Sequence, residues 1–569
     1  MVLGDSVFLL LIFSISFLIF FSAWRSIKKW KKMPPGPTPL PFVGNILQVK
    51  PTDMLNSFRK LHKTYGPAYV IYLGTLPVLI LNGYDAVKEA LIDNADVFGA
   101  RGSSPGFKMF FTEYGIVSSN GERWKQLRRF ALMTLRNFGM GKRSIEERIQ
   151  EEAKFLVEEF KKTKGSPFDP TFYFSRSSSN IICSVIFGNR FDYQEEKFVA
   201  LLKLLNQFSK LFDSPFTQIF NIFPHIMQYV PGPHLRVMEN MTRLKEFIIE
   251  KKKMNEESLD PNCPRDFIDC FLIKREMEKQ NPASEFNDDN LVMSTLNLFF
   301  AGSETTSATL RYAFLILLKY PEITENVVRE IDLVIGQERA PAVEDRSKMP
   351  YTDAVIHEVQ RFADIAPLGA PHEVTQDIEF RGYTIPKGTM VFPALTTVLK
   401  DPKWFKNPYS FDPGHFLDEN GAFKKNDAFM PFSAGKRICL GEGLARMELF
   451  LIITTILQNL TLTTTKEPKD IDLSSAPIGQ ALADLEVGYR IFSDDIQFFV
   501  HVSRTKDKAL QKVYFCLKCL NQWLTKNKLV LNMSKTEILY LVRYPTWDFL
   551  RNLDIDETSI NIYINKNVK

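Results

Sequence analysis

The sequence is short of cysteine and of excess charge, and each shortage argues against a class of protein. A formal net charge of +5 over 569 residues gives no reason to expect a nucleic-acid partner. Neither an internal repeat nor a low-complexity tract is present. Hydrophobic residues make up 45% of the chain and charged residues 24%, which fits a globular protein with a large core. The cysteines are too few and too scattered for a disulfide scaffold, and they favour a reducing compartment; they are Cys183, Cys263, Cys270, Cys439, Cys516 and Cys519.

Charge is absent altogether from residues 7–24, VFLLLIFSISFLIFFSAW, which as a helix would span about 27 Å, close to the thickness of a bilayer core. The basic stretch RSIKKWKK follows, whereas only Asp5 is charged before the run, so the positive-inside rule places the body of the protein in the cytosol. A cleaved signal peptide would need basic residues before the run and a small-residue cleavage site after it, and the sequence has neither. We therefore predict a single transmembrane helix with its stop-transfer segment over residues 1–32.

Proline and helical patterns organise the chain after residue 32. The prolines of MPPGPTPLP predict a stiff, extended hinge over residues 33–41. Beyond it, the expected fold is mainly α with small β-sheets, in a domain over residues 42–480. The clearest patterns predict a hairpin and two helices; they cover 68–82 with a turn at Gly74 and Thr75, 121–138, and Asp288 to about Lys319.

Polar residues interrupt the second of these helices at AGSETT, residues 301–306. A glycine costs a helix about 1 kcal/mol relative to alanine, and serine and threonine hydroxyls can bond the backbone of the preceding turn, so the patch can open the helix and admit water. A small residue such as Ala301 would leave room for a flat ligand, and Glu304 beside Thr305 could relay protons. A polar patch that faces the surface explains these residues equally well.

Two further pairs have the spacing of neighbours on one helix face. Glu358 and Arg361, in HEVQR, are three residues apart and can form an ion pair, which many helices carry without any function. Trp124 and Arg128, in WKQLR, are four residues apart and would present an indole N–H and a guanidinium together, a fair clamp for a carboxylate. An ordinary amphipathic helix is the alternative interpretation of the second pair.

The stretch FSAGKRICLG, residues 432–441, sets one cysteine between glycines. A metal would bind Cys439 as its thiolate, which needs stabilisation. Gly435 and Gly441 let the backbone turn so that N–H groups point at the sulfur, and a helix that starts near Leu444 would direct its positive end toward it. No Cys or His stands at zinc spacing, whereas a single thiolate suits haem iron because the porphyrin supplies the equatorial ligands. A buried structural thiol is the alternative.

Together these motifs resemble those of the cytochrome P450 haem-thiolate monooxygenases. AGSETT resembles the family's oxygen-activation motif, Glu358 and Arg361 its ExxR pair, and the Trp124 and Arg128 pair its haem-propionate clamp, all in the family's order. The anchor and hinge resemble those of microsomal members, and FGARGSSP, PLGAPHEVTQD and FDPGHFLD look most like the vertebrate family-two xenobiotic and fatty-acid group. The resemblance covers roughly residues 1–480. The residues that match the signature F-x-x-G-x-R-x-C-x-G are Phe432, Gly435, Arg437, Cys439 and Gly441.

The resemblance implies haem b, iron protoporphyrin IX, as the cofactor, with Cys439 as the axial ligand whose thiolate favours O–O cleavage. Glu304 and Thr305 would be catalytic and deliver protons to dioxygen, while Glu358 and Arg361 would form a structural ion pair near the loop of residues 407–411. The reaction would insert one oxygen atom of O2 into an apolar substrate, such as a xenobiotic, a fatty acid or a steroid-like compound. The implied cofactor-binding residues are Arg101, Trp124, Arg128, Ala301, His372, Phe432, Gly435, Arg437 and Gly441.

The substrate would lie above the haem against a wall of aromatic and aliphatic groups, so a lipophilic ligand is expected. Core packing is the alternative for any one of these positions. The positions that the resemblance implies as substrate-binding are Phe107, Phe110, Val117, Phe208, Asn297, Phe300, Ala301, Ala366 and Leu368.

Electrons would come from NADPH through NADPH–cytochrome P450 reductase, with cytochrome b5 as a further partner, at the endoplasmic reticulum membrane. An acidic partner would be attracted by basic side chains on the expected proximal side. A solvated basic face explains each of them separately about as well. These side chains are Lys125, Arg129, Arg136, Lys142 and Arg143.

The resemblance ends near Gln480, and residues 481–569 differ in character. FSDD, residues 492–495, and the later CLNQWLTKNKLVLNMSKTE are similar to the palm segment of retrotransposon reverse transcriptases. A polymerase needs a third carboxylate, two metal ions and a nucleotide-binding region, and the haem domain stands where the missing Asp would be, so we interpret Asp494 and Asp495 as relics without catalytic function. Cys516 and Cys519 lack a second Cys/His pair, so no zinc site is expected.

This replaced ending leaves alternatives open. The family's last hairpin, which contributes pocket residues, would be missing or replaced, and an unpaired sheet edge favours aggregation. A non-enzymatic or poorly folded membrane fusion product is therefore the alternative function. Haem chemistry without O2, such as peroxide rearrangement, ranks lower because Glu304 and Thr305 are present.

Overall fold

Contacts divide the chain into two units, Met1–Ala481 and Leu482–Lys569. The computed structural model describes residues 32–40, 43–49, 54–102, 104, 108, 112–138, 143–164, 168–212, 214–464 and 467–473, and four strands after residue 486. The predicted transmembrane segment, residues 7–24, lies outside this part of the chain. Among the residues that are described, no helix combines the length and the apolar character needed to cross a bilayer. Also outside lie Phe107, Phe110, Lys142, Asp494, Asp495, Cys516 and Cys519.

Helices make up most of the first unit, in keeping with the expected fold class. The α-helices are α2 (Met54–Tyr65), α3 (Gly83–Lys88), α5 (Gly115–Ser118), α6 (Gly121–Asn137), α7 (Arg143–Lys162), α8 (Thr171–Ile186), α9 (Glu196–Phe212), α10 (Pro215–Ile222), α11 (Pro224–Met227), α12 (Pro233–Glu257), α13 (Phe267–Met277), α14 (Asp288–Lys319), α15 (Pro321–Val334), α16 (Pro350–Ala363), α17 (Leu395–Leu399) and α18 (Glu442–Asn459). Short π- or 3-10 turns are η2 (Glu89–Asp93), η3 (Val343–Lys348), η4 (Pro413–Phe416), η5 (Gly435–Arg437) and η6 (Pro468–Asp470).

The long helix α14 has the bounds that the sequence predicts. The Asn287 side chain caps its first turn by accepting a hydrogen bond from Asn290 N at 2.9 Å, and Pro321 begins the next helix. α14 packs against α5, α8, α12, α16 and α18, which explains why it is apolar on nearly every side. The expected opening at residues 301–306 is not seen, because α14 runs through this patch as an unbroken α-helix.

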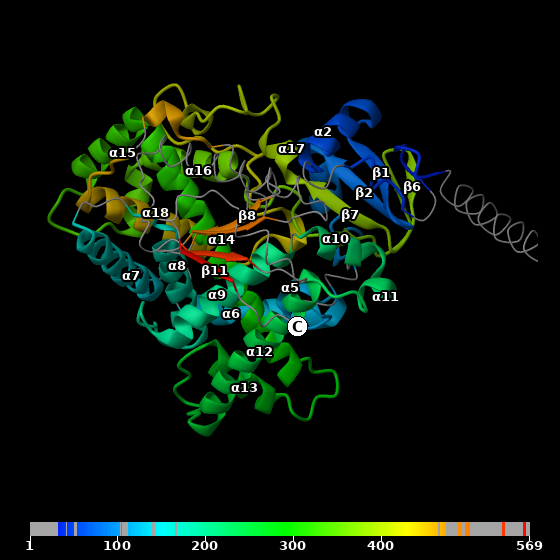
Figure 1. Ribbon diagram of the computed structural model, residues 1–569, viewed down its shortest axis with the longest axis horizontal. Coiled ribbons are helices and arrows are strands. Elements are labelled where there is room, and N and C mark those ends of the chain that lie inside the picture. The colour runs from blue at the N-terminus through cyan, green and yellow to red at the C-terminus, as the bar shows by residue number, and fades with distance from the viewer. Residues whose placement is uncertain are drawn as a thin grey trace, which may run out of the picture. The chain divides into compact units, whose positions relative to one another are not determined.

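A five-stranded sheet lies beside the helices and brings distant residues together (Figure 1). Its order is β1-β2-β7-β4-β3, from β1 (Ala68–Leu73), β2 (Leu76–Asn82), β7 (Met390–Ala394), β4 (His372–Glu373) and β3 (Ala100–Arg101). β1 and β2 form the predicted antiparallel hairpin, with Leu73 opposite Leu76. The antiparallel pair β3 and β4 sets Arg101 opposite His372, so the sheet edge positions two residues of the expected haem site. A second hairpin joins β5 (Ile378–Phe380) and β6 (Tyr383–Ile385).

The proline-rich segment packs on the sheet edge. Val70 N donates to Pro35 O at 3.0 Å, and Met33 is buried. A Cβ on Gly36 would lie 1.9 Å from Val70 O, so only glycine permits this close approach. The segment is therefore fixed against β1 at Pro35 and Gly36.

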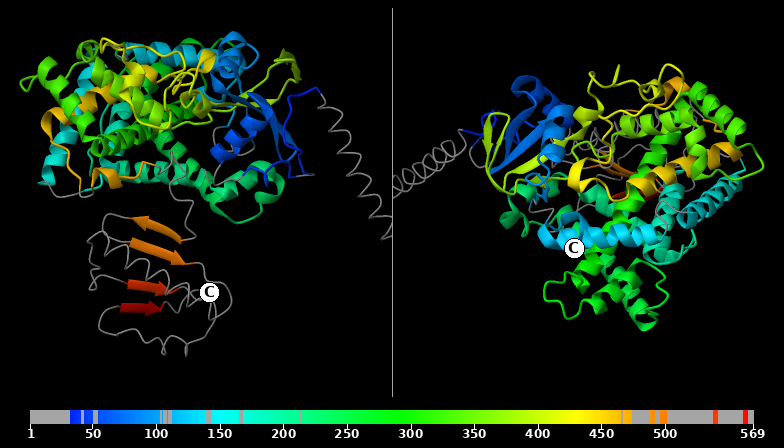
Figure 2. Two further views of the ribbon diagram at one scale, coloured as in Figure 1. Left: turned by 90° about the horizontal axis from the view of Figure 1, so that it is seen from above. Right: turned by 180° about the vertical axis from the view of Figure 1, so that it is seen from behind.

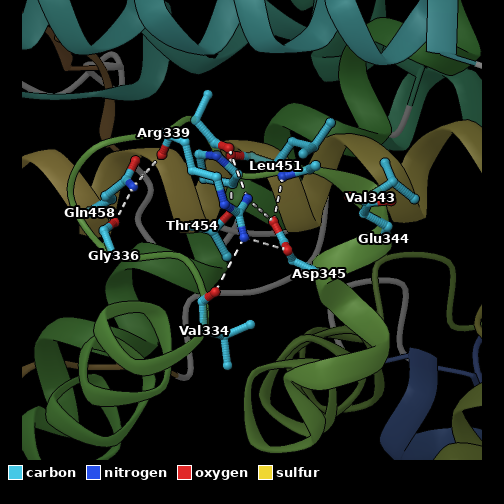
Figure 3. Close-up of polar contacts among 12 residues, drawn as sticks. Val334, Gly336, Arg339, Val343, Glu344, Asp345, Leu451, Thr454 and Gln458 are labelled. Atoms are coloured by element: carbon cyan, nitrogen blue, oxygen red, sulfur yellow. Dashed lines mark hydrogen bonds and ion pairs between the residues drawn. The ribbon is translucent and has the colours of Figure 1, made fainter.

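The far end of α18 is held by a polar cluster (Figure 3). Gln458 donates to Gly336 O at 2.6 Å and to Arg339 O at 2.8 Å. The Arg339 guanidinium binds both carboxylate oxygens of the buried Asp345, at 2.6 and 2.7 Å. A bidentate pair of this kind fixes direction as well as distance. α18 is thus held to the chain between α15 and η3, which steadies the helix that begins beside Cys439.

The described residues of the second unit form two pairs of strands, coloured orange and red in Figure 2. β8 (Val487–Ile491) and β9 (Ile496–Val500) pair antiparallel on either side of residues 492–495. β10 (Glu537–Tyr540) and β11 (Asn561–Ile564) pair parallel. FSDD thus lies between two paired strands.

Candidate functional site

The loop that carries Cys439 is built on backbone contacts. Cys439 N donates to Phe432 O at 3.0 Å, which closes the loop on itself. Gly435 has φ +71°, and a Cβ there would lie 1.7 Å from Leu91 O, so no other residue fits without moving the backbone. α18 begins at Glu442, two residues earlier than the predicted start near Leu444. The helix N-terminus consequently directly follows Gly441.

Opposing effects act on the pKa of the Cys439 thiol. Although it has exposed area, protein surrounds it closely, and burial is the main cause that raises its pKa above the usual value. Hydrogen bonds from the backbone of Gly441 and Glu442, together with the nearby Arg128 charge, act in the opposite direction. These N–H groups and the helix N-terminus would stabilise a thiolate once a metal ion displaces the proton.

Basic and aromatic side chains meet next to this loop. The Arg437 guanidinium lies 3.9 Å from the Trp124 ring centroid and donates to Gly99 O at 2.8 Å. Arg128 donates to Ile438 O at 2.7 Å, beside Cys439. The structure thus brings together five of the predicted cofactor-binding residues, from α6, β3, β4 and η5, namely Arg101, Trp124, Arg128, His372 and Arg437.

The three guanidiniums of this cluster are not balanced by acidic groups. Within the described residues, none of them forms an ion pair with a carboxylate, and Arg437 Nη1 is buried without a hydrogen-bond partner. Burial and the repulsion of Arg101 and Arg128 lower the pKa of Arg437 to about 8, and burial and Arg128 lower that of Arg101 to about 10. A ligand with two carboxylates would relieve this repulsion and use the free donors. The propionates of the expected haem have this charge and chemistry, so the residues present fit the cofactor.

The structure places His372 beside Arg101, within the cluster that the sequence predicts to bind the cofactor. Its Nδ1 lies 2.7 Å from Phe98 O, so this nitrogen carries the hydrogen, assigned from the hydrogen-bond network. Its Nε2 then accepts from Arg101 Nη1 at 3.2 Å. Burial, followed by the charge of Arg101, lowers the pKa of His372 to about 3, so the ring is neutral. In this arrangement His372 positions the Arg101 guanidinium.

Asn120 was missed by sequence reasoning, although it connects two arginines of the cluster. Its Oδ1 accepts from Arg101 N at 2.7 Å and from Arg437 Nη2 at 2.6 Å, and its Nδ2 donates to Arg101 O at 3.0 Å. Asn120 stands at the N-cap of α6 but makes no capping hydrogen bond there. An asparagine directly before a predicted helix is the only local signal, and it points to capping instead.

On α14, Glu304 and Thr305 face different surroundings. Glu304 lines a small cavity with residues of α8 and α9, and its Oε1 lies 3.4 Å from Arg311 Nη2. Burial raises the pKa of Glu304, and the charges of Arg311 and Lys210 partly offset this. Thr305 is exposed, and its hydroxyl donates to Ala301 O at 2.6 Å. Among the contacts described, none joins Glu304 to the Thr305 hydroxyl.

The predicted substrate-lining residues divide into packed and accessible groups. Phe208 is 1% exposed and meets Phe300 edge to face, with centroids 5.3 Å apart. Asn297 Oδ1 accepts from Val117 N at 3.1 Å, so this amide holds α5 on α14. Ala301 and Ala366 are exposed, whereas Leu368 packs against the sheet.

Glu358 and Arg361 form a pair with no exposed side-chain area. Their bidentate contacts are 2.6 and 2.7 Å, and the guanidinium also donates to the carbonyls of Leu399, Pro408 and Ser410. Glu358 accepts in addition from Asp412 N at 2.9 Å and lies 3.2 Å from His415 Nδ1. All of these partners hold the loop between α17 and η4.

Comparisons with known proteins agree with this geometry. A family model described as cytochrome P450 matches residues 34–485. Cytochrome P450 2G1 of Rattus norvegicus is 56% identical over 474 residues, which are 83% of this chain and 96% of the relative. Cytochrome P450 2C8 of Homo sapiens is 54% identical over 484 residues, 85% of this chain and 98% of the relative. Cytochrome P450 2F3 of Capra hircus is 53% identical over 487 residues, 86% of this chain and 99% of the relative. Residues 486–569 lie outside the family match.

Proposed function

Because the chain belongs to the cytochrome P450 family, whose members are haem-thiolate monooxygenases, we propose that Cys439 ligates the haem iron and that the enzyme oxidises lipophilic small molecules. One oxygen atom of O2 would enter the substrate, which we place among xenobiotics, fatty acids and steroid-like compounds. The observation that carries this proposal is the unbalanced cluster of Arg101, Arg128 and Arg437 beside Cys439. Such a cluster suits a cofactor with two carboxylates.

The bound haem would supply the redox centre at which dioxygen is activated. Arg437 Nη1 and the remaining N–H groups of Arg101 would hold the propionates. The Arg437 guanidinium lies over the Trp124 ring, and this contact holds it in one orientation. The exposed face of α14 at Ala301 and Thr305 would leave space for the flat ring and for the substrate.

Glu304 would hold and release the protons that the reaction consumes. Its raised pKa keeps a proton on the carboxyl at a higher pH than usual, which suits a general acid. To act on the Thr305 side of α14, the carboxyl must leave Arg311. We therefore propose that Glu304 alternates between its ion pair and Thr305 Oγ1.

NADPH–cytochrome P450 reductase, with cytochrome b5 as a further donor, would supply electrons at the endoplasmic reticulum membrane. Arg129 and Arg136 are exposed cations on α6, the helix that also carries Trp124 and Arg128. Lys125 is paired with Glu122 at 2.6 Å and contributes less to an attractive field. An acidic partner docked on Arg129 and Arg136 would lie close to the haem site.

The reduced, carbon-monoxide-bound spectrum of the purified protein tests the assignment of Cys439. The native chain should show the red-shifted Soret band of a thiolate ligand, and Cys439→Ala should lose it completely. Cys263→Ala removes an exposed cysteine away from the site and should keep the band. A native chain that binds haem without this band would contradict the proposal.

Deletion of residues 481–569 tests the alternative of a non-enzymatic fusion product. We propose that this second unit adds no haem-binding residue, so the full and shortened chains should incorporate equal haem and turn over the same substrates. Haem incorporation by the shortened chain alone would favour a poorly folded fusion product. Loss of haem on deletion would show that residues 481–569 complete the site.

A further inference from the structure

A cavity of about 450 Å³ lies between α2 and the chain after α17 and is lined mainly by basic residues. Its cations come from two distant segments, Arg59, Lys60 and Lys63 on α2 and Lys400 at the end of α17. No carboxylate belongs to the lining, which Pro402, Pro408 and Tyr409 complete. A hollow with charges of one sign over an apolar floor concentrates its electric field and attracts ions of opposite sign.

The acidic side chain that follows Lys400 in the loop does not belong to the lining of this cavity. Asp401 directly follows Lys400, but its Oδ1 accepts from Lys403 N at 2.9 Å and is turned into its own loop. Asp364 and Glu358 interact electrostatically with Lys400, but neither belongs to the lining. The charges of Arg59, Lys60 and Lys63 therefore have no carboxylate in the lining to balance them.

Arg59 is held in a fixed orientation at the cavity. Its Nη1 donates to the Tyr409 hydroxyl at 2.9 Å, and its Nη2 lies 2.5 Å from Asn56 Oδ1. A guanidinium has five N–H donors, so the fork keeps donors beyond these two. A preorganised guanidinium loses less entropy on binding an anion than a freely rotating one.

Lys400 forms the partly buried wall of the cavity and links it to α16. Its Nζ donates to Phe362 O at 3.0 Å and lies 4.4 Å from the Phe362 ring centroid. Burial and the neighbouring Arg361 lower its pKa to about 8, although the charges of Asp364 and Glu358 act in the opposite direction. An anion in the cavity would stabilise the charged form of Lys400.

We propose that this cavity binds a phosphate-bearing anion, either a free phosphorylated compound or the headgroup of an acidic phospholipid. Multiply charged phosphate oxygens accept hydrogen bonds from Arg59 and from Lys60 and Lys63 at once. A volume of about 450 Å³ exceeds that of inorganic phosphate and leaves space for a second phosphate or a glycerol group. The proposal is independent of the haem chemistry, because none of these side chains belongs to the cofactor cluster.

Isothermal titration of the full-length holoenzyme with inorganic pyrophosphate tests the site. We expect saturable binding that weakens as salt is raised. The double variant Lys60→Gln/Lys63→Gln should weaken binding about tenfold or more, since two charges leave the ligand's reach. The matched control, Lys154→Gln/Lys203→Gln, removes the same charge from exposed positions on α7 and α9 and should bind like the native chain.

Competition then identifies the source of the phosphate. Displacement of pyrophosphate by short-chain phosphatidic acid, but not by glycerol 3-phosphate, would assign the site to a lipid headgroup. Equal displacement by both would assign it to a free phosphorylated compound. Absence of saturable pyrophosphate binding, or equal weakening by the cavity variant and the control, would overturn the proposal. An unchanged haem spectrum of each variant ensures that the comparison concerns folded protein.

Discussion

Arg361 and Arg437 are both buried guanidinium groups, but the balance of charge around them is opposite. Arg361 shares a bidentate pair with Glu358 and donates to three backbone carbonyls. Arg437 stands near Arg101 and Arg128, has no acidic partner among the described residues and keeps one buried nitrogen without a partner. A buried guanidinium that is paired with a carboxylate, like that of Arg361, stabilises the fold. An unbalanced one carries repulsion that a ligand can remove, so it indicates a binding site.

Removal of the carboxylate at Arg361 should have the largest effect. Glu358→Gln keeps the shape of the side chain but leaves a buried guanidinium without a counter-charge, which costs about 3–5 kcal/mol of unfolding free energy. Urea denaturation, followed by far-UV circular dichroism, measures this change.

The matched control for this variant is Glu419→Gln, because Glu419 is exposed in the loop after η4. It should change the unfolding free energy by no more than a few tenths of a kcal/mol. A Glu358→Gln protein as stable as this control would show that Arg361 has other compensation, and the comparison of the two arginines would fail.

Removal of Arg437 should instead affect the cofactor. In Arg437→Gln the repulsion with Arg101 and Arg128 falls, so the haem-free protein should lose far less stability than Glu358→Gln does. The bound haem loses a charged hydrogen-bond donor, which is worth about 1.5–3 kcal/mol, so haem should dissociate about tenfold faster or more. Haem transfer to apomyoglobin measures this rate.

Arg129→Gln removes a cation of the same charge from an exposed position on α6 and serves as the control. It should release haem at the native rate. If Arg437→Gln destabilised the haem-free protein as much as Glu358→Gln does, Arg437 would be a structural arginine as well.

Local signals explain what the sequence could predict. The bounds of α14 follow from Asn287 directly before its start and Pro321 just beyond its end, and both signals lie next to the segment in the sequence. The β1–β2 hairpin follows in the same way from two apolar runs around Gly74. Motif spacing likewise identifies Cys439, because the residues that build the loop around it are close together in the sequence.

Long-range contacts explain what the sequence could not predict. Arg101 and His372 are separated by 271 residues and meet only because β3 pairs with β4. The role of Asn120 depends on Arg437, which comes from η5 and lies 317 residues away. The direction of Glu304 depends on Arg311, two turns along α14, and on the small cavity beside α8. The motif AGSETT gives the residue types but not the face that each side chain occupies.

The smallest expected effect concerns the pH dependence of the Glu358 and Arg361 pair. Burial alone would lower the pKa of His415, but its hydrogen bond and charge interaction with Glu358 raise it above the usual value. Both ring nitrogens face oxygen acceptors, Glu358 Oε2 and Lys406 O, so the charged ring fits this position. Because the pKa is higher in the folded state, the stabilisation is complete below the unfolded-state pKa of about 6.5 and is lost as pH rises through the folded-state value.

His415→Gln should therefore cost about 1 kcal/mol of unfolding free energy at pH 6 and less at pH 9. Urea denaturation of both proteins at the two pH values measures the difference. The direction of the pH dependence distinguishes the two arginine sites. The pKa of His372, beside Arg101, is lowered, so the stability that the neutral His372 ring contributes would be lost as pH falls. A cost that is larger at pH 9 than at pH 6 would mean that His415 is neutral beside Glu358, and that Arg361 alone balances this carboxylate.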